Sequence, residues 1–269
     1  MRTATALLLA LLFSLSSFAQ DTYRKLTFPD GRTSGEGNVD SNGKLNGEWT
    51  FYHENGMKKS GGLYVHGSAQ GCWYFWTPEG KLGSYGWYKN NELDSVWFTF
   101  FPNGGIQRIA YYRHDTLNGP FVEFWGDTIK KEAGAYLHGK KQGAWVKWYP
   151  NTKLMEEAWY EQDIVNGNYV HYYDNGKIES KGKIVQGKAE GEWKFYDTAG
   201  NLFVKGTYKH GQWDGKWSDY KPSGKRNSTG CYKDGVKVKK WRYFGDDGKT
   251  DRKEIYRHGK LFKTVSYAS

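Results

Sequence analysis

Aromatic, glycine and turn-forming residues recur along this chain with a period of 24 residues, without insertion or deletion, over residues 47–262. Counting Gly47 as position 1 gives nine repeats, and this numbering is used throughout. A fixed period of this size is typical of a repeat array rather than of a single globular core. The nine repeats begin at Gly47, Gly71, Ser95, Gly119, Gly143, Gly167, Gly191, Gly215 and Lys239.

Four positions of the repeat carry most of the pattern. Positions 3 and 6 are aromatic in all nine repeats, position 18 is tyrosine in eight, and position 16 is glycine or alanine in eight. Periodic apolar residues are usually core residues, so positions 3 and 18 are predicted to form the structural core of the repeats. Its predicted members include Trp49, Trp73, Trp97, Trp145, Trp193, Trp217, Trp241, Tyr64, Tyr136 and Tyr208.

Two turn signals divide each repeat. Positions 9–10 read Asn-Gly in three repeats, and positions 20–21 read His-Gly or similar polar pairs. Such dipeptides between strand-type residues predict β-hairpins with two-residue loops. A two-residue loop at 9–10 places position 3 opposite position 16, so each aromatic ring is expected to cover backbone that a strand glycine leaves bare. The sequence therefore predicts an all-β, elongated, single-layer antiparallel meander of β-hairpins.

Alternation along a strand places positions 3, 16 and 18 on one face and position 6 on the other. A single sheet has no second layer to cover position 6. Its aromatic rings, such as Tyr52, Trp76 and Trp148, are therefore candidate binding residues.

The pattern G-x-W-x-x-Y-x-x-x-G followed by G-x-Y-x-x-G resembles the MORN-repeat family, and most closely its bacterial variant. The segments YHENGMKKSGGLYVHGSAQGCW and YDTAGNLFVKGTYKHGQWDGKW carry the resemblance. It implies an elongated sheet of hairpins with a role in binding or scaffolding. Some bacterial relatives are labelled antitoxins and some eukaryotic ones are linked to membrane phospholipids. Ser95, Thr128 and Thr152 depart from the pattern, because each replaces a glycine.

The two ends of the chain differ from the repeats. Residues 1–19 combine Arg2, an apolar run and a Ser17-Phe18-Ala19 cleavage site, which predicts an export signal. The mature chain is therefore expected outside the cytoplasm (periplasmic, on the outer surface or secreted). Because no cysteine lies near the cleavage site, a lipoprotein is not expected. Residues 20–46 are interpreted as a degenerate N-terminal repeat that caps an open sheet edge, and residues 263–269 as a tail.

The net charge of +10 is concentrated at the C-terminal end. Residues 215–269 carry 15 Lys and Arg against 6 Asp and Glu. This balance favours an anionic binding partner. The candidates are an envelope polymer or lipid and a protein with an acidic surface, with nucleic acid less favoured. The alternative is a solvated surface that keeps the array soluble and protects its last strand. If the charge serves binding, the candidate residues are Lys237, Lys239, Lys240 and Arg242.

No motif indicates catalysis, a cofactor or a metal site. Five of the seven histidines occupy position 20, where asparagine, glutamine and aspartate alternate with them, so they are interpreted as turn residues. Cys72 and Cys231 lie six repeats apart, too far for a disulfide within one chain. The sequence thus predicts a non-catalytic binding or scaffolding protein, with a glycan-binding, lectin-like module of the cell envelope as the alternative.

Overall fold

A computed structural model describes residues 21–126 and 128–267, and these residues form one open sheet of 21 strands. The predicted export signal at residues 1–19 lies outside the described residues. The strands are β1 (Thr22–Thr27), β2 (Thr33–Val39), β3 (Leu45–Tyr52), β4 (Lys58–Val65), β5 (Ser68–Trp76), β6 (Leu82–Lys89), β7 (Glu92–Phe100), β8 (Ile106–Arg113), β9 (Thr116–Phe124), β10 (Lys130–Leu137), β11 (Lys140–Trp148), β12 (Leu154–Glu161), β13 (Ile164–Tyr172), β14 (Ile178–Val185), β15 (Lys188–Tyr196), β16 (Leu202–Lys209), β17 (Gln212–Tyr220), β18 (Arg226–Lys233), β19 (Val236–Phe244), β20 (Thr250–Arg257) and β21 (Lys260–Ser266).

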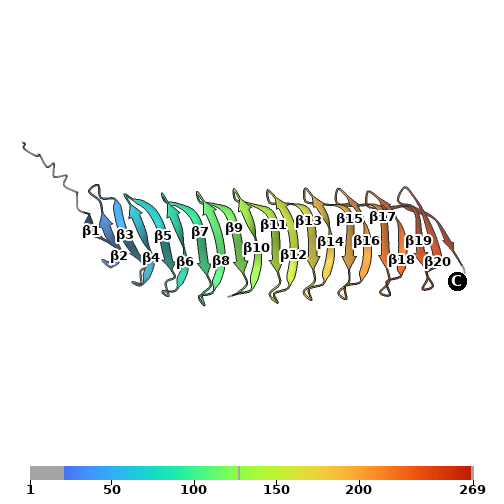
Figure 1. Cartoon of the computed structure of the whole chain (residues 1–269), viewed down its shortest axis with the longest axis horizontal. Coiled ribbons are helices and arrows are strands. Elements are labelled where there is room, and N and C mark those ends of the chain that lie inside the picture. Colours follow the sequence, from blue (N-terminus) through green and yellow to red (C-terminus); the bar gives the residue numbers. More distant parts are fainter. Residues whose placement is uncertain (1–20, 127, 268–269) are drawn as a thin grey trace, which may run out of the picture.

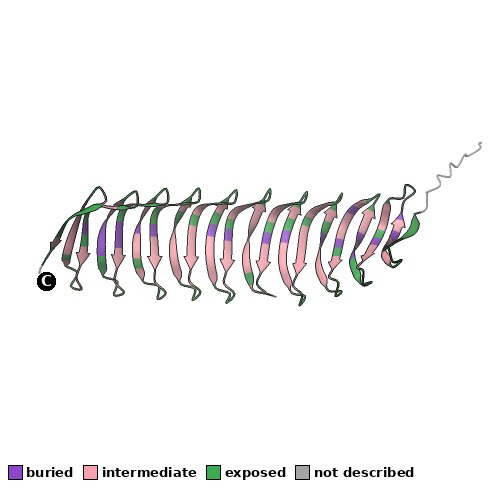
Figure 2. Ribbon diagram, turned by 180° about the vertical axis from the view of Figure 1, so that it is seen from behind, coloured by how far each residue is buried: buried purple, intermediate pink, exposed green. Residues whose placement is uncertain are grey.

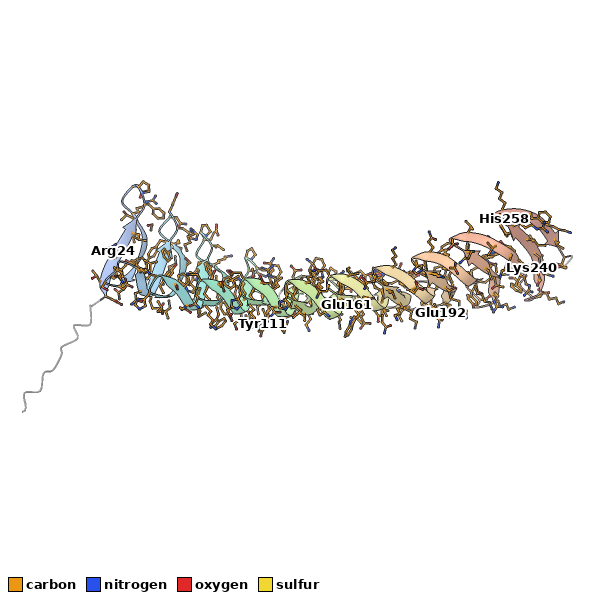
Figure 3. The ribbon with its side chains drawn as sticks, turned by 90° about the horizontal axis from the view of Figure 1, so that it is seen from above. Arg24, Tyr111, Glu161, Glu192, Lys240 and His258 are labelled. Carbon is orange, nitrogen blue, oxygen red and sulfur yellow. The ribbon has the colours of Figure 1, made fainter. Side chains whose placement is uncertain are left out.

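Each strand pairs, antiparallel, with the strands before and after it in the chain. The sheet is therefore a meander, drawn out into a long rod whose strands lie across its axis like curved ribs (Figure 1). Seen along the strands, the rod is bowed (Figure 3). The predicted fold class is confirmed.

The turns at positions 20–21 are the two-residue loops that the sequence predicts. Residues at both positions have positive φ, as at His66 (48°) and Gly67 (86°), and as at Asn90 (53°) and Asn91 (70°). Two consecutive residues in this region define a type I′ turn, which matches the right-handed twist of the flanking strands. The position-20 histidines are thus turn residues, as interpreted from the sequence.

The turns at positions 9–10 differ from the prediction. In the first repeat, the amide of His53 donates to the carbonyl of Met57 at 2.8 Å, and the amide of Gly56 donates to the carbonyl of His53 at 2.9 Å. The loop is therefore a four-residue turn closed by a left-handed glycine (φ 82° at Gly56) rather than a two-residue loop. Asn-Gly suits both geometries, because the asparagine side chain also accepts a hydrogen bond from the amide two residues on, here that of Met57 at 3.0 Å.

Thr152 occupies the glycine position of this turn in repeat 5 with φ of 70°. A β-branched residue is strained in the left-handed region, at a cost of roughly 1–3 kcal/mol. Thr152→Gly is therefore expected to raise the free energy of unfolding by about 1 kcal/mol, the net of relieved strain and the greater freedom of glycine in the unfolded chain. Thr198→Gly, two residues before the turn glycine of repeat 7, is the control. If both substitutions lower the melting temperature, Thr152 is not strained.

A bulge at position 1 separates each repeat from the one before it. In β5, Trp73 pairs with Gly62 but Gln70 pairs with Leu63, so Gly71 and Cys72 are left without partners on that side. Gly71 is left-handed, with φ of 66°. The bulge leaves the carbonyl of Leu63 without a strand partner, and the indole N–H of Trp73 donates to it at 3.3 Å.

The same bond recurs at five further position-3 tryptophans, with N–O distances of 2.6–3.2 Å: Trp49, Trp145, Trp193, Trp217 and Trp241. Strict alternation does not anticipate this bulge. It makes the position-3 indole part of the hydrogen-bond ladder between repeats as well as part of the core.

The two faces of the sheet are each lined by aromatic rings. On the tryptophan face (positions 3, 5, 16 and 18), the Trp49 and Phe51 rings lie 5.7 Å apart, and Tyr64 meets Trp73 edge-on at 4.9 Å. On the opposite face (positions 2, 4, 6, 15 and 17), Tyr74 lies 5.9 Å from Trp76 and 5.6 Å from Tyr85. Positions 3 and 6 therefore do lie on different faces.

Each position-3 ring covers the preceding repeat rather than its own, which corrects the expected packing. Trp145 does pair with Ala158 of its own hairpin. However, a Cβ added at Gly134, one repeat earlier, would lie less than 3.0 Å from the Trp145 ring. The glycine at position 16 thus leaves room for the indole of the next repeat to pack flat against the backbone. We call this position the seat of that ring. The seven seats and their indoles are Gly37/Trp49, Gly62/Trp73, Gly86/Trp97, Gly134/Trp145, Gly182/Trp193, Gly206/Trp217 and Gly230/Trp241.

Two seats are alanine, and both carry a smaller ring. Ala110 pairs with Phe121, and Ala158 pairs with Tyr169. Elsewhere glycine goes with tryptophan, so seat and ring match in size across every junction. This matching buries six position-3 tryptophans to an exposed fraction of 6% or less in a sheet of one layer, with Trp97 half-buried. The buried residues recur mid-strand along the rod (Figure 2).

Candidate functional site: the basic end of the sheet

The predicted position-6 binding residues form a half-buried row on the opposite face. The Lys58 ammonium lies 5.9 Å from the Trp76 ring centroid, and the Lys130 ammonium lies 5.6 Å from that of Trp148. The Tyr52 hydroxyl donates to Glu36 at 2.6 Å. This hydrogen bond, with burial, raises the pKa of Tyr52 to about 12. Each of these three residues thus already contacts a charged side chain of the protein.

Three of the four predicted basic residues lie together. Lys239, Lys240 and Arg242 line a hollow of about 270 Å³ on the opposite face, together with Lys216 and Cys231. Lys240 is labelled in Figure 3 near the C-terminal end of the bow. We call Lys216, Lys239, Lys240 and Arg242 the basic cluster. Lys216 was missed because it lies 24 residues before Lys240, but the repeat period itself could have found it, since both occupy position 2.

The four cations of the basic cluster are exposed, and none forms an ion pair or hydrogen bond within residues 21–126 and 128–267. Other cations of the same region are paired, such as Lys221 with Asp246 at 2.6 Å and Lys233 with Asp214 at 2.9 Å. The positive charge of the cluster is therefore not neutralised by the described part of the chain, so an anion on this face would meet four converging donors.

Lys237 does not belong to this cluster. Its ammonium lies on the tryptophan face, 4.4 Å from the Trp241 ring centroid, and donates to the Tyr243 hydroxyl at 3.0 Å. Position 23 lies over the indole of the next repeat, so the Lys237 side chain packs among the aromatic rings of the tryptophan face. Its contacts are those of a structural residue.

Other candidate chemistry is sparse in the part of the chain that the structure describes. It contains no group of three or more His, Cys, Asp or Glu side chains that could hold a metal ion. Cys72 and Cys231 are both free thiols. The described residues include no helix that is long and apolar enough to span a membrane.

These features define an open-sheet β-repeat protein with charged and aromatic surfaces. The family model described as "MORN repeat variant" matches residues 45–66, 165–184 and 189–210. The match at three repeats supports the resemblance to MORN repeats that the sequence pattern indicates, and such repeats suggest a repeat-protein binding module.

Solved structures give only distant likenesses. The TcdB2-TccC3-TEV crystal structure is 11% identical, with a TM-score of 0.19, and the match covers 92% of this chain and 16% of that one. The Tc holotoxin pore of Photorhabdus luminescens, with the TccC3-D651A mutation, is 12% identical, with a TM-score of 0.18 and the same coverage. This chain thus spans about a sixth of their length, and scores this low do not indicate a shared structure. No curated protein matches the chain.

Proposed function

We propose that this protein is an exported, non-catalytic binding module that holds an anionic macromolecule against the basic cluster. The observation that carries the proposal is the convergence of Lys216, Lys239, Lys240 and Arg242 on one hollow, without carboxylate partners among the described residues. The site is open and shallow enough for a polymer or a lipid headgroup layer. A rod of repeats can then present the bound partner at a fixed distance from its other end.

The backbone at Lys239 also supports this proposal. Position 1 is glycine in seven repeats, and Lys239 has φ of 59° there. A non-glycine residue in the left-handed region is costly, and such outliers concentrate at functional sites. A strained lysine that lines the hollow is consistent with selection for its charge rather than for its backbone.

Replacing the four residues of the basic cluster by serine is expected to weaken binding to polyphosphate and to phosphatidylglycerol vesicles. A surface cation contributes about 1 kcal/mol toward an anionic membrane, so the expected loss is on the order of a hundredfold or more. The salt dependence of binding should also flatten, because fewer counterions are released. Cosedimentation at several salt concentrations measures both effects.

The control variant replaces Lys59, Lys89, Lys140 and Lys188, which are exposed on distant repeats, by serine. It removes the same net charge and should bind nearly as tightly as the parent. If both variants lose affinity equally, overall charge and not the cluster governs binding. If the cluster variant binds as well as the parent, the basic end only serves solubility and protection of the last strand.

A glycan is the second candidate ligand, and exposed aromatic rings on the opposite face favour it. Tyr74 is 42% exposed, Trp87 37% and Tyr111 38%. Flat, exposed rings of this kind can stack on sugars. Retention of the cluster variant on a glycan array, together with its loss after Trp87→Ala, would favour this candidate over the anionic one.

A further inference from the structure

A separate hollow of about 320 Å³ lies on the tryptophan face over repeats 7 to 9. Seven of its ten lining residues are aromatic, and Asp219 is the one charged residue among them. Six of the aromatic side chains that line it are Phe195, Tyr208, Trp213, Trp217, Tyr232 and Trp241.

Position 5 of repeat 8 contributes no ring to fill this space. In repeat 1, Phe51 occupies this position and lies 5.7 Å from Trp49 and 6.4 Å from Trp73. In repeat 8 the residue is Asp219, whose side chain is much smaller than a phenyl ring. The region between two successive indoles, which a phenyl ring occupies in repeats 1, 2 and 7, is therefore not filled by a ring here.

A second departure from the repeat adds a wall to this hollow. Position 23 is leucine before repeats 3 and 4, but it is Trp213 before repeat 8. The Trp213 ring lies 4.8 Å from that of Trp217 and 4.9 Å from that of Tyr232. Its indole N–H donates to the Tyr208 hydroxyl at 3.0 Å, which fixes its orientation. The hollow is thus a built aromatic cage, with Trp213 41% exposed at its rim.

The carboxylate of Asp219 gives the cage a negative charge. Its oxygens accept hydrogen bonds from the Asn227 amide, at 2.6 Å, and from the Ser228 hydroxyl. Both donors are neutral, and Asp219 forms no ion pair with any described residue. An oriented carboxylate without a counter-charge, beside several aromatic faces, is complementary to a cation.

In other repeats, lysine ammonium groups lie over the rings of the tryptophan face. The Lys141 ammonium lies 3.8 Å from the Trp145 ring centroid, and the Lys237 ammonium lies 4.4 Å from that of Trp241. Both lysines occupy position 23, the position that Trp213 occupies before repeat 8. The charge of Lys237 is balanced through the Tyr243 hydroxyl, which donates to Glu254 at 2.7 Å. The Lys237 ammonium thus lies at the Trp241 edge of the cage, whereas no described cation lies over the rings of Trp213, Trp217 or Tyr232.

We propose that this cage binds an organic ammonium group, quaternary or alkylated, from a ligand outside the described chain. Apolar substituents on the nitrogen would contact the rings while its charge faces Asp219. A sugar fits less well, because a sugar ring needs several hydrogen-bonding partners and the cage offers one carboxylate and tyrosine hydroxyls. The cage is on the face opposite to the basic cluster, so this inference does not depend on the proposed anionic partner.

The test is a titration of the full chain with choline, followed by tryptophan fluorescence and calorimetry. The matched probe is 3,3-dimethyl-1-butanol, which has the shape of choline without its charge. Choline is expected to bind at least about tenfold more tightly than the alcohol, as a cation within an aromatic cage should. Equal binding of the two probes, binding of neither, or binding of methyl glucoside in preference to choline would overturn the proposal.

Two variants locate the site. Trp213→Leu, which restores the leucine of Leu93 and Leu117, and Asp219→Asn should each weaken choline binding by about tenfold. Trp159→Leu removes a 51% exposed tryptophan from the opposite face and should leave choline binding unchanged. If choline binds both cage variants as it binds the parent, the site lies elsewhere and the proposal fails. The comparison of the two probes on the parent decides the matter even where a variant does not fold.

Discussion

Trp145→Ala is expected to lower the free energy of unfolding by about 3–5 kcal/mol, the range for truncating a buried aromatic side chain. Trp145 is 2% exposed. Its ring covers Gly134, and its indole N–H donates to the carbonyl of Ala135 at 3.1 Å. The substitution therefore removes core volume and also leaves a bulge carbonyl without its donor.

Denaturant unfolding of the full chain measures this loss. The matched control is Lys140→Ala in the same strand, because Lys140 is exposed and forms no side-chain hydrogen bond or ion pair within the described ranges. Lys147 is a poor control, since it lies on the tryptophan face and pairs with Glu156 at 2.9 Å. Equal unfolding midpoints for Trp145→Ala and Lys140→Ala would show that position 3 is not the core of the array.

Gly134→Ala is expected to destabilise the protein by about 1–3 kcal/mol, the usual cost of overpacking. The added Cβ would lie less than 3.0 Å from the Trp145 ring. The chain itself indicates the remedy, because Ala110 carries Phe121 and Ala158 carries Tyr169. Trp145→Phe in the Gly134→Ala background is therefore expected to recover part of the loss.

A double-mutant cycle over Gly134 and Trp145 separates this effect from ordinary destabilisation. The two substitutions should be coupled by about 0.5–3 kcal/mol, with the double variant more stable than the sum of the single effects predicts. Simple additivity would mean that the seat and the ring do not contact each other in the way the structure places them.

Much of this fold could be predicted from the sequence. The period set the number of hairpins, and polar or glycine pairs at positions 20–21 identified type I′ turns such as that of His66 and Gly67. The turn at His53–Met57 was predicted wrongly, because Asn-Gly serves two loop lengths equally well. The match between Gly134 and Trp145 was also missed, since positions were compared within each repeat rather than across the junction to the next.

The candidate sites were less predictable. Strict alternation would place Lys239 and Lys240 on opposite faces, but the bulge at Lys239 lets both line one hollow with Arg242. Lys237 lies instead among the rings of the other face. The aromatic cage results from a missing ring at Asp219 and an additional one at Trp213. Position 5 varies between repeats, whereas position 23 carries an aromatic ring only at Trp213, and the hollow depends on how three repeats pack together.

The seat-and-ring arrangement gives the array a direction. Every repeat offers a ring toward the N-terminus and a seat toward the C-terminus, so successive repeats join only head to tail. At the N-terminal end, Gly37 in β2 provides the seat for Trp49, the first indole. At the other end, the seat position holds Glu254, which pairs with Thr264 and accepts hydrogen bonds from Tyr243 and Tyr256. Every other seat is glycine or alanine, so we expect that a repeat added after the ninth also requires a small residue in place of Glu254. Extension of the array at its C-terminal end thus depends on one side chain. A repeat inserted directly after the N-terminal hairpin would need no such change, because Gly37 would provide the seat for its indole.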